Sequence, residues 1–409
     1  MSSPAIASNQ PAPLAIEGIW RKLPIILVLV GVVFGAIGLF VNIKQFAYSY
    51  LLAFMFFLSI CLGGLFLSIL HHLFDANWTA PLRRVSEHLA ALLPIMAILF
   101  IPIAILGPTQ LYRWLQVADP HADHAIAAKY PLFTKSGFYI TAIIIFSLWT
   151  WLSLRMRYWS LRQDRTGEAL CTYALRRHSA YGIYVFAFTL TLAAIMWMKS
   201  LEYQWFSTMY GVYYFAGSVW VTLATLYVLA LVLQRTGSLS GVVHNRTFHD
   251  AGVLFFAFTV FYAYIAFSQY FLIWNAAMPE ETFWYVQREK GSWWDIGMIM
   301  IFGHFLFPFL VMLRIDTKLN PVIMIPLCAW AWLMHFMDMS FNVMPILHPE
   351  NFGIHWLDVA CMAFIGGVLS LVFIKYFNSH PAFPIKDPRL AEALGVHHAG
   401  GRPPIAAAD

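Results

Sequence analysis

The chain has 409 residues, of which 60% are hydrophobic, 17% are aromatic and only 11% are charged, and its mean hydropathy is +0.68. This composition excludes a soluble globular protein of the same size and indicates a polytopic membrane protein. The net charge of +5 does not indicate nucleic-acid binding, because the basic residues lie between apolar runs and form no single patch.

Ten apolar runs follow one another along the chain, and each is long enough to cross a hydrocarbon core of about 30 Å. The alternating pattern of barrel strands is absent, so we expect an all-α membrane protein. The first run follows Arg21 and Lys22 as a signal peptide would, but it is too long and lacks a convincing cleavage site, so we predict a helix there. The expected spans are 24–41, 50–74, 86–107, 137–154, 180–198, 209–234, 251–274, 293–313, 321–345 and 356–377.

Basic residues predict the orientation of these spans. Most of the 25 Lys and Arg residues fall on the side that also carries both chain ends, and the positive-inside rule makes that side cytoplasmic. The sequence therefore predicts a cytoplasmic tail at 1–23, a ten-helix domain at 24–377 and a second cytoplasmic tail at 378–409. The Pro-, Ala- and Gly-rich composition of both tails predicts poor order.

Ionisable residues gather at the end of the second span, in LHHLFDANWTAPLRRVSEHLA at 70–90. Such groups are costly near a membrane core unless they pair or face water, so His71, His72, Asp75, Arg83 and Glu87 form a candidate proton path. His71 and Asp75 are spaced to share one helical face, where the acid can form a relay with the imidazole. The two adjacent arginines are equally typical of side chains that snorkel to the interface.

Two further spans carry ionisable groups. His304 lies in FGHFLFPF, where Pro308 removes the donor to the His304 carbonyl and predicts a kink that can hold water. His335 and Asp338 share a helical face in LMHFMDMSFN, with Asn342 following. A satisfied core histidine is the alternative for His304, whereas an ionisable pair inside a span is hard to explain by packing. We predict that His304, His335 and Asp338 continue the proton path at staggered depths.

The cysteines offer no pattern for a cofactor. Cys61, Cys171, Cys328 and Cys361 are scattered, without the CxxCH of covalent haem or the CxxC spacing of iron–sulfur and zinc sites. We therefore expect no metal or cofactor bound by this chain itself. A haem between two histidines would require His71, His304 or His335 to meet, and no matched pair of spans supports that arrangement.

Several segments resemble one known family. They are H71HLFDANWTAPLRR84, R157YWSLRQDRTGE168, T208MYGVYYFAGS218 and F267SQYFLIWNAAMPEETFWY285 followed by H304FLFPF309, which together reach from about residue 50 to 320. These are similar to the NrfD-like, polysulfide-reductase membrane subunit family, and within it to the shorter such subunit of alternative complex III, the quinol:cytochrome c or cupredoxin oxidoreductase of bacterial electron transport.

The resemblance implies two four-helix bundles, at spans two to five and six to nine, with peripheral first and last spans. It implies partners, namely a second NrfD-like subunit, an iron–sulfur protein and c-type cytochromes, which carry the iron–sulfur clusters and haem c. Quinol is a possible ligand, and aromatic and Met-rich walls such as Trp197 and Met198, or 330–336, are either an isoprenoid site or ordinary core.

Proton conduction by an accessory, non-catalytic subunit is therefore the expected function, ahead of quinol chemistry. Two alternatives remain. A stand-alone secondary transporter would show paired helix breaks in inverted halves, and the break at Pro308 has no clear counterpart. A purely scaffolding membrane subunit would leave the intramembrane acids unexplained.

Overall fold

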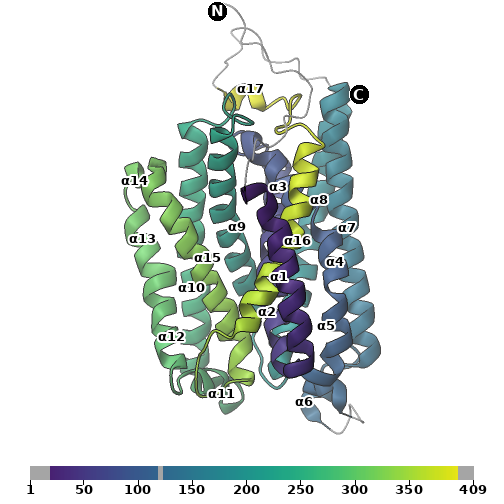
Figure 1. Ribbon diagram of the computed structural model, residues 1–409, viewed down its shortest axis with the longest axis vertical. Coiled ribbons are helices and arrows are strands. Elements are labelled where there is room, and N and C mark those ends of the chain that lie inside the picture. The colour runs from purple at the N-terminus through teal and green to yellow at the C-terminus, as the bar shows by residue number, and fades with distance from the viewer. Residues whose placement is uncertain (1–18, 118–122, 395–409) are drawn as a thin grey trace, which may run out of the picture.

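A computed structural model describes residues 19–117 and 123–394, and every regular element in these two ranges is a helix. Ten of the helical stretches are long and apolar enough to cross a membrane, which confirms the predicted all-α class and the number of spans. The helices form one elongated bundle with their axes roughly along its length (Figure 1). Of the predicted tail at 1–23, residues 1–18 lie outside the described residues, and 19–23 already belong to the first helix.

Each predicted span coincides with a helical stretch to within one residue at its ends or lies inside it. They are α1 (Ile19–Val41), α2 (Ile43–Leu73), α3 (Arg83–Ala90) continued by α4 (Leu93–Leu99) and α5 (Ile101–Leu106), α7 (Lys135–Thr166), α8 (Ala169–Ala193), α9 (Tyr210–Arg235), α10 (Asn245–Ala276), α12 (Trp293–Ile299) continued by α13 (Phe307–Met312), α15 (Pro321–Val343) and α16 (Trp356–Asn378). Shorter helices are α6 (His124–Ala127), α11 (Pro279–Arg288), α14 (Ile315–Leu319) and α17 (Leu390–Ala393).

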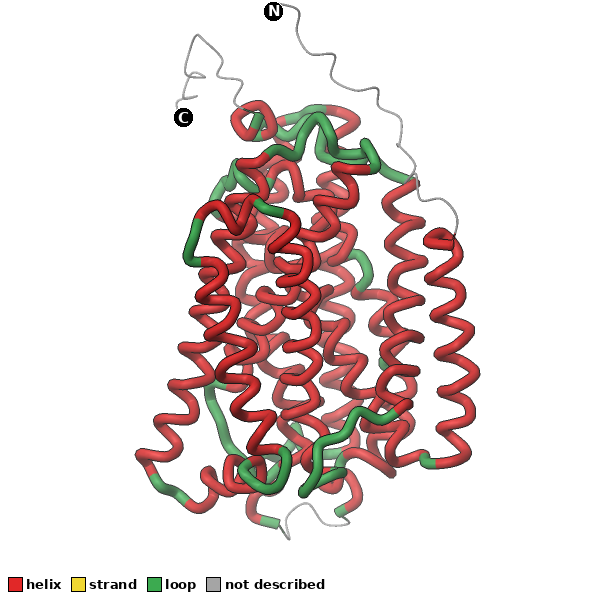
Figure 2. The backbone as a smooth tube through the Cα atoms, turned by 60° about the vertical axis from the view of Figure 1, so that its left-hand side comes forward, coloured by secondary structure: helices red, strands yellow, loops and turns green. Residues whose placement is uncertain are grey.

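The two ends of the bundle are distinguished by these short helices. α17 lies at the end where α2 and α7 terminate, which we call the terminal face, and α6 and α11 lie at the other end, which we call the opposite face (Figure 1). The tube view in Figure 2 shows loops concentrated at both faces, with helices filling the space between them. Apart from the short breaks at 91–92 and 100 in the third span, this arrangement keeps irregular backbone out of the apolar middle (Figure 2), as a membrane requires.

Helix α2 lies at the centre of the bundle. It packs against α3, α8, α9, α15 and α16, and the whole of its apolar window is buried. Close approach depends on adjacent glycines: a Cβ at Gly63 would lie 2.1 Å from Thr222 Oγ1 of α9, and one at Gly64 would lie 2.7 Å from Leu89 Cβ of α3. Because α2 contacts α9 and α15 as well as α3 and α8, the division into two four-helix bundles stays a prediction.

Three spans contain a π-helical segment, at Gly107–Leu111, Ala194–Met198 and Met300–Leu306. The third lies directly before α13, where Pro308 cannot donate to the His304 carbonyl. The irregular helix expected at this proline is therefore present, and His304 sits within it.

The predicted poor order of the C-terminal tail is wrong for residues 379–394, which we call the C-terminal strap. This segment crosses the terminal face (Figure 1) and ends in α17. Its Asp387 side chain is fully buried and its Ile385 amide donates to Asp164 Oδ1 over 3.0 Å. Composition did not reveal that polar partners on three helices hold this segment in place.

Candidate functional site

Asp338 is the centre of a set of buried side chains that we call the midspan cluster. Its members are Asp338, His335, His304, Tyr213, Tyr262 and Asn342. The Asp338 carboxylate is 1% exposed, and its Oδ1 accepts hydrogen bonds from the Tyr213 hydroxyl and from Asn342 Nδ2, the latter at 3.2 Å. The Tyr213 hydroxyl also lies 2.8 Å from that of Tyr262. Asp338 Oδ2 has no hydrogen-bond partner among the described residues. The acid thus has one oxygen held by protein donors and one left available.

His335 lies one turn before Asp338 on α15 and is likewise fully buried. Its Nε2 is 2.9 Å from Ser59 Oγ of α2, whereas its Nδ1 has no partner in the described chain. Gly217 of α9 faces this ring, and a Cβ there would lie 3.6 Å from Nδ1. The imidazole therefore occupies a space that the glycine keeps open.

His304 is held between two aromatic rings. Its ring stacks on Trp220 and on Tyr262, with centroid distances of 3.9 Å to each. It is fully buried, and neither of its ring nitrogens has a hydrogen-bond partner in the described residues. Buried polar atoms are normally satisfied by protein or by ordered water, so a satisfied core histidine at this position would require water as its partner.

The three ionisable residues of the midspan cluster meet α9 at successive turns. Asp338 bonds Tyr213, His335 faces Gly217, and His304 stacks on Trp220. From the first to the last of these α9 positions the helix rises about 10 Å. Because α9 begins at the opposite face and ends at the terminal face, the acid lies nearest the opposite face and His304 farthest from it.

A polar connection leads from Asp338 towards the opposite face. The backbone carbonyl of Asn342 accepts from Arg288 at 3.2 Å, and the same guanidinium donates to Glu202 Oε2 at 2.9 Å. Arg288 is buried with its guanidinium 3.6 Å from the centroid of Trp284. Glu202 lines a cavity of about 200 Å³, together with Arg113, Leu201, Tyr203, Gln204, Phe283, Gln287 and Ile346.

Sequence reasoning missed Arg288 and Tyr213 as members of this site. Tyr213 lies in a run of aromatic residues that periodicity assigns to core, and Arg288 lies in α11, outside any span. The available signal was Tyr262, a hydroxyl side chain within the seventh span, which lies 2.8 Å from the Tyr213 hydroxyl. Only the packing of α9, α10, α11 and α15 shows that these residues share one acid.

The predicted relay between His71 and Asp75 is wrong. Helix α2 ends at Leu73, and Asp75 follows with a left-handed φ of 52°, which turns its side chain away from the helix. His71 instead places Nδ1 2.6 Å from Thr79 Oγ1 and Nε2 3.1 Å from Asp387 Oδ2. Asp75 is half exposed and pairs with Arg176, at 2.7 Å, and with Arg389.

The adjacent arginines do not snorkel, because both are 1% exposed. Arg83 forms ion pairs with Asp387 and, at 3.1 Å, with Glu87. Arg84 also pairs with Glu87, at 2.6 Å, and with Asp164 of α7. We call these residues and His71 the terminal cluster. It joins α2, α3, α7 and the C-terminal strap into one buried charge network.

His72 and His88 border this network. The rings of His71 and His72 meet edge to face with centroids 4.7 Å apart. His88 Nδ1 lies 3.0 Å from an Arg157 guanidinium nitrogen. His72 Nδ1 and His88 Nε2 have no partners among the described residues. His72 and His88 therefore each present, beside the terminal cluster, one imidazole nitrogen that no described protein group satisfies.

The two clusters are separated by an apolar length of α2. His335 contacts α2 at Ser59, and His71 lies about 18 Å farther along the helix. Ser68 is the hydroxyl side chain between them, and it donates to the Gly64 carbonyl of its own helix. His71 thus does not meet His304 or His335, and the described residues contain no group of three or more His, Cys, Asp or Glu able to hold a metal.

The strap carboxylate Asp387 predicts a pH response. Burial raises the pKa of Asp387, but Arg83 and His71 outweigh that effect and hold it below its ordinary value of 3.8. A carboxyl with a lowered pKa stabilises the folded state above its unfolded pKa, and this contribution is lost as the pH falls through the folded value. We expect hydrogen exchange, corrected for intrinsic rates, to show a protected strap from pH 7 to about 4 and weakening protection below.

Asp387→Asn should loosen the strap already at pH 7 and remove most of this dependence. Asp316→Asn, which alters an exposed ion pair with Arg314, is the matched control and should change nothing. Loosening of the unsubstituted protein between pH 8 and 6, or an unchanged acid response in the Asp387 variant, would contradict the assignment.

Chemically, the described site can hold and exchange protons. It combines carboxylates, imidazoles and phenols in a low-dielectric interior, and several of their polar atoms have no protein partner. Comparison with protein-family models and with curated proteins gave no match.

Proposed function

We propose that this chain is an integral membrane subunit of an electron-transport complex of the alternative complex III type, in which it conducts or couples protons while partner subunits oxidise quinol. One observation carries the proposal. Asp338, His335 and His304 are buried against successive turns of α9, and each has at least one polar atom without a partner in the described residues. Burying three such groups costs desolvation free energy, and a purely scaffolding role does not explain why the protein retains them.

The proposed proton path begins at the polar cavity on the opposite face. Glu202 is at its edge, and Arg288 and Asn342 link Glu202 to Asp338. The hydroxyls of Tyr213 and Tyr262 extend the chain of exchangeable protons towards the ring of His304. The carboxylates, phenols and imidazole of this path can both donate and accept a proton, as a relay requires, whereas Arg288 has no acceptor and positions Glu202 and Asn342.

The path then meets the apolar length of α2 that separates the midspan cluster from the terminal cluster. We place the gate of the conductor there, since the mainly apolar packing between the two clusters cannot conduct a proton without water. His71, Asp387, Arg83 and Glu87 form the proton-exchanging group on the far side of this gate. A conformational change that admits water between the two clusters would couple proton movement to events in the partner subunits.

Electron transfer is assigned to partners. The proposed partners are a second NrfD-like subunit, an iron–sulfur protein and c-type cytochromes, and the four cysteines of this chain, all buried and free, provide no ligand set for a cluster. Blue-native electrophoresis of gently solubilised membranes tests this assembly. Co-migration with haem and iron–sulfur subunits is expected, whereas a lone band would favour a stand-alone transporter.

Membrane orientation is a further prediction. The excess of basic residues on the terminal face makes that face cytoplasmic, in a bacterial inner membrane. Reporters fused after Phe377 should be active when they require the cytoplasm and silent when they require the periplasm. An active periplasmic reporter at this position would invert the topology and exchange the two ends of the proposed path.

A further inference from the structure

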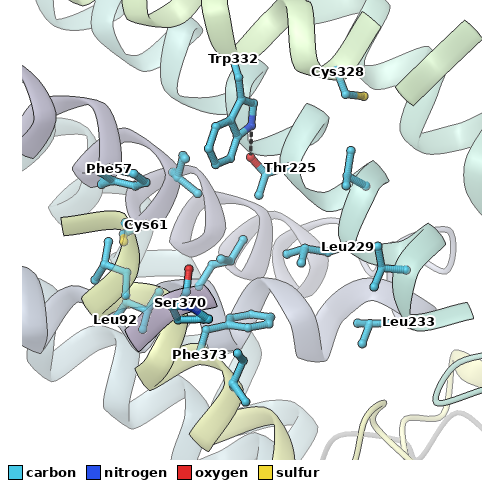
Figure 3. A pocket seen from close by; sticks show the side chains of 18 of the residues that line it. Phe57, Cys61, Leu92, Thr225, Leu229, Leu233, Cys328, Trp332, Ser370 and Phe373 are labelled. Carbon is cyan, nitrogen blue, oxygen red and sulfur yellow. Dashed lines mark hydrogen bonds between the residues drawn. The ribbon is translucent and has the colours of Figure 1, made fainter. Parts of the chain in front are cut away.

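An elongated apolar groove lies beside the gate region, between α1, α2, α9, α15 and α16. Its volume is about 690 Å³, and its wall includes Phe57 and Cys61 of α2, Trp332 of α15 and Phe373 of α16 (Figure 3). This volume falls within the range of about 300–1,000 Å³ typical of small-molecule sites. Neither the midspan cluster nor the terminal cluster contributes a lining side chain.

The indole and the threonine hydroxyl of the wall are already satisfied, and its other polar side chains are Ser370 and the thiols of Cys61 and Cys328. Trp332 Nε1 donates to Thr225 Oγ1 at 3.0 Å, as the dashed line in Figure 3 shows, and Thr225 in turn donates to the Val221 carbonyl at 2.8 Å. An occupant would therefore gain little from a polar head in this part of the groove. The chemistry of the wall fits hydrocarbon.

The groove runs along the helices towards the terminal face. On α9 its wall extends from Thr225 to Leu233, and on α16 from Gly366 to Ile374, and each stretch spans about 12 Å of helix. Both helices proceed towards the terminal face over these residues. The site thus has the direction of a lipid chain that enters from the leaflet at that face.

Three basic residues lie one or two positions from lining residues, on the parts of α1, α9 and α16 nearest the terminal face. Lys22 precedes the lining residue Pro24, Lys375 follows the lining residue Ile374, and Arg235 lies just beyond Leu233. All three side chains are exposed, and none of them makes an ion pair within the described chain. The helices that form this end of the groove therefore carry three cations without an internal counter-ion among the described residues, which would attract a lipid phosphate.

We propose that this groove binds an anionic phospholipid, with one acyl chain along α9 and α16 and the phosphate against Lys22 and Lys375. Apolar length supplies the affinity, and the lysines select an anionic over a zwitterionic head group. The site is independent of proton conduction, because it uses neither buried cluster.

Native mass spectrometry of the delipidated full chain tests this site. Phosphatidylglycerol, phosphatidylcholine with the same acyl chains, and menaquinone are added separately as probes. We expect one retained phosphatidylglycerol, bound at least tenfold more tightly than phosphatidylcholine. Lys22→Ala and Lys375→Ala should each lower this preference about fivefold. Lys44→Ala should leave it unchanged, because this exposed lysine lies near the start of α2, at the opposite face.

Filling the groove provides a second, independent arm. Ala329 is an exposed lining residue, so Ala329→Trp should prevent retention of both phospholipids. Ile143→Trp, on a part of α7 that is 66% exposed, adds the same ring away from the groove and should have no effect. Equal retention of the two phospholipids, retention that survives Ala329→Trp, or menaquinone as the ligand retained at this site would each overturn the proposal.

Discussion

Asp338→Asn is expected to reduce quinol-linked proton movement at least tenfold while the complex still assembles. Asparagine keeps the shape of the side chain and can still accept from Tyr213 and Asn342, but it cannot take up and release a proton. Purified complex reconstituted in vesicles with an internal pH indicator measures the effect directly. Proton uptake is recorded per quinol oxidised, so that slower turnover alone does not imitate lost coupling.

A second buried carboxylate supplies the control. Asp358 of α16 is also buried, but it accepts from Ser49 Oγ at 2.5 Å and from the His355 amide at 2.8 Å, and it has no contact with the midspan cluster. Asp358 and His355 form a capping box at the start of α16, so Asp358→Asn should lower the free energy of unfolding. It should leave the number of protons moved per quinol unchanged. If Asp338→Asn assembles and moves protons at the unsubstituted rate, Asp338 is structural. A failure of Asp338→Asn alone to assemble would equally count against a proton-transfer role.

The fold was largely predictable because hydropathy in a bilayer is a local property. Each span needs its own apolar length, so the ten helices follow from one window at a time. The same reasoning located His335 and Asp338, since an ionisable pair inside a span stands out without any knowledge of its neighbours. Pro308 likewise predicted the irregular helix around His304, because proline lacks the backbone N–H that would bond the His304 carbonyl.

The partners of these residues were not predictable in the same way, because they depend on which helix faces meet. His71 is paired with Asp387, more than three hundred positions away, whereas a helical spacing pointed to Asp75. Asp75 lies two residues beyond the end of α2 and has a left-handed backbone conformation, which separates its side chain from His71. Tyr213 and Arg288 were hidden for the same reason, since neither has an ionisable neighbour in sequence that hints at Asp338.

Arg83→Met is expected to destabilise the folded protein by about 3–5 kcal/mol, the range measured when one partner of a buried ion pair is removed. The guanidinium is 1% exposed and serves Asp387, Glu87 and, at 3.0 Å, Ser160 Oγ. Methionine can fill much of the same volume, so the loss is mainly electrostatic. Asp387 would keep its burial but lose its nearest cation, and the C-terminal strap would lose its anchor.

Reversible unfolding in mixed detergent micelles measures this loss, and two variants locate its cause. Arg314→Met removes one partner of an ion pair that is about three-quarters exposed, so it should cost less than about 1 kcal/mol. Adding Asp387→Asn to Arg83→Met removes the abandoned charge and should recover part of the lost stability, because an unpaired buried carboxylate is more costly than a neutral amide. If the double variant is less stable than Arg83→Met by the full cost of Asp387→Asn alone, the two side chains contribute independently. The terminal cluster would then owe its stability to packing rather than to the Arg83–Asp387 pair.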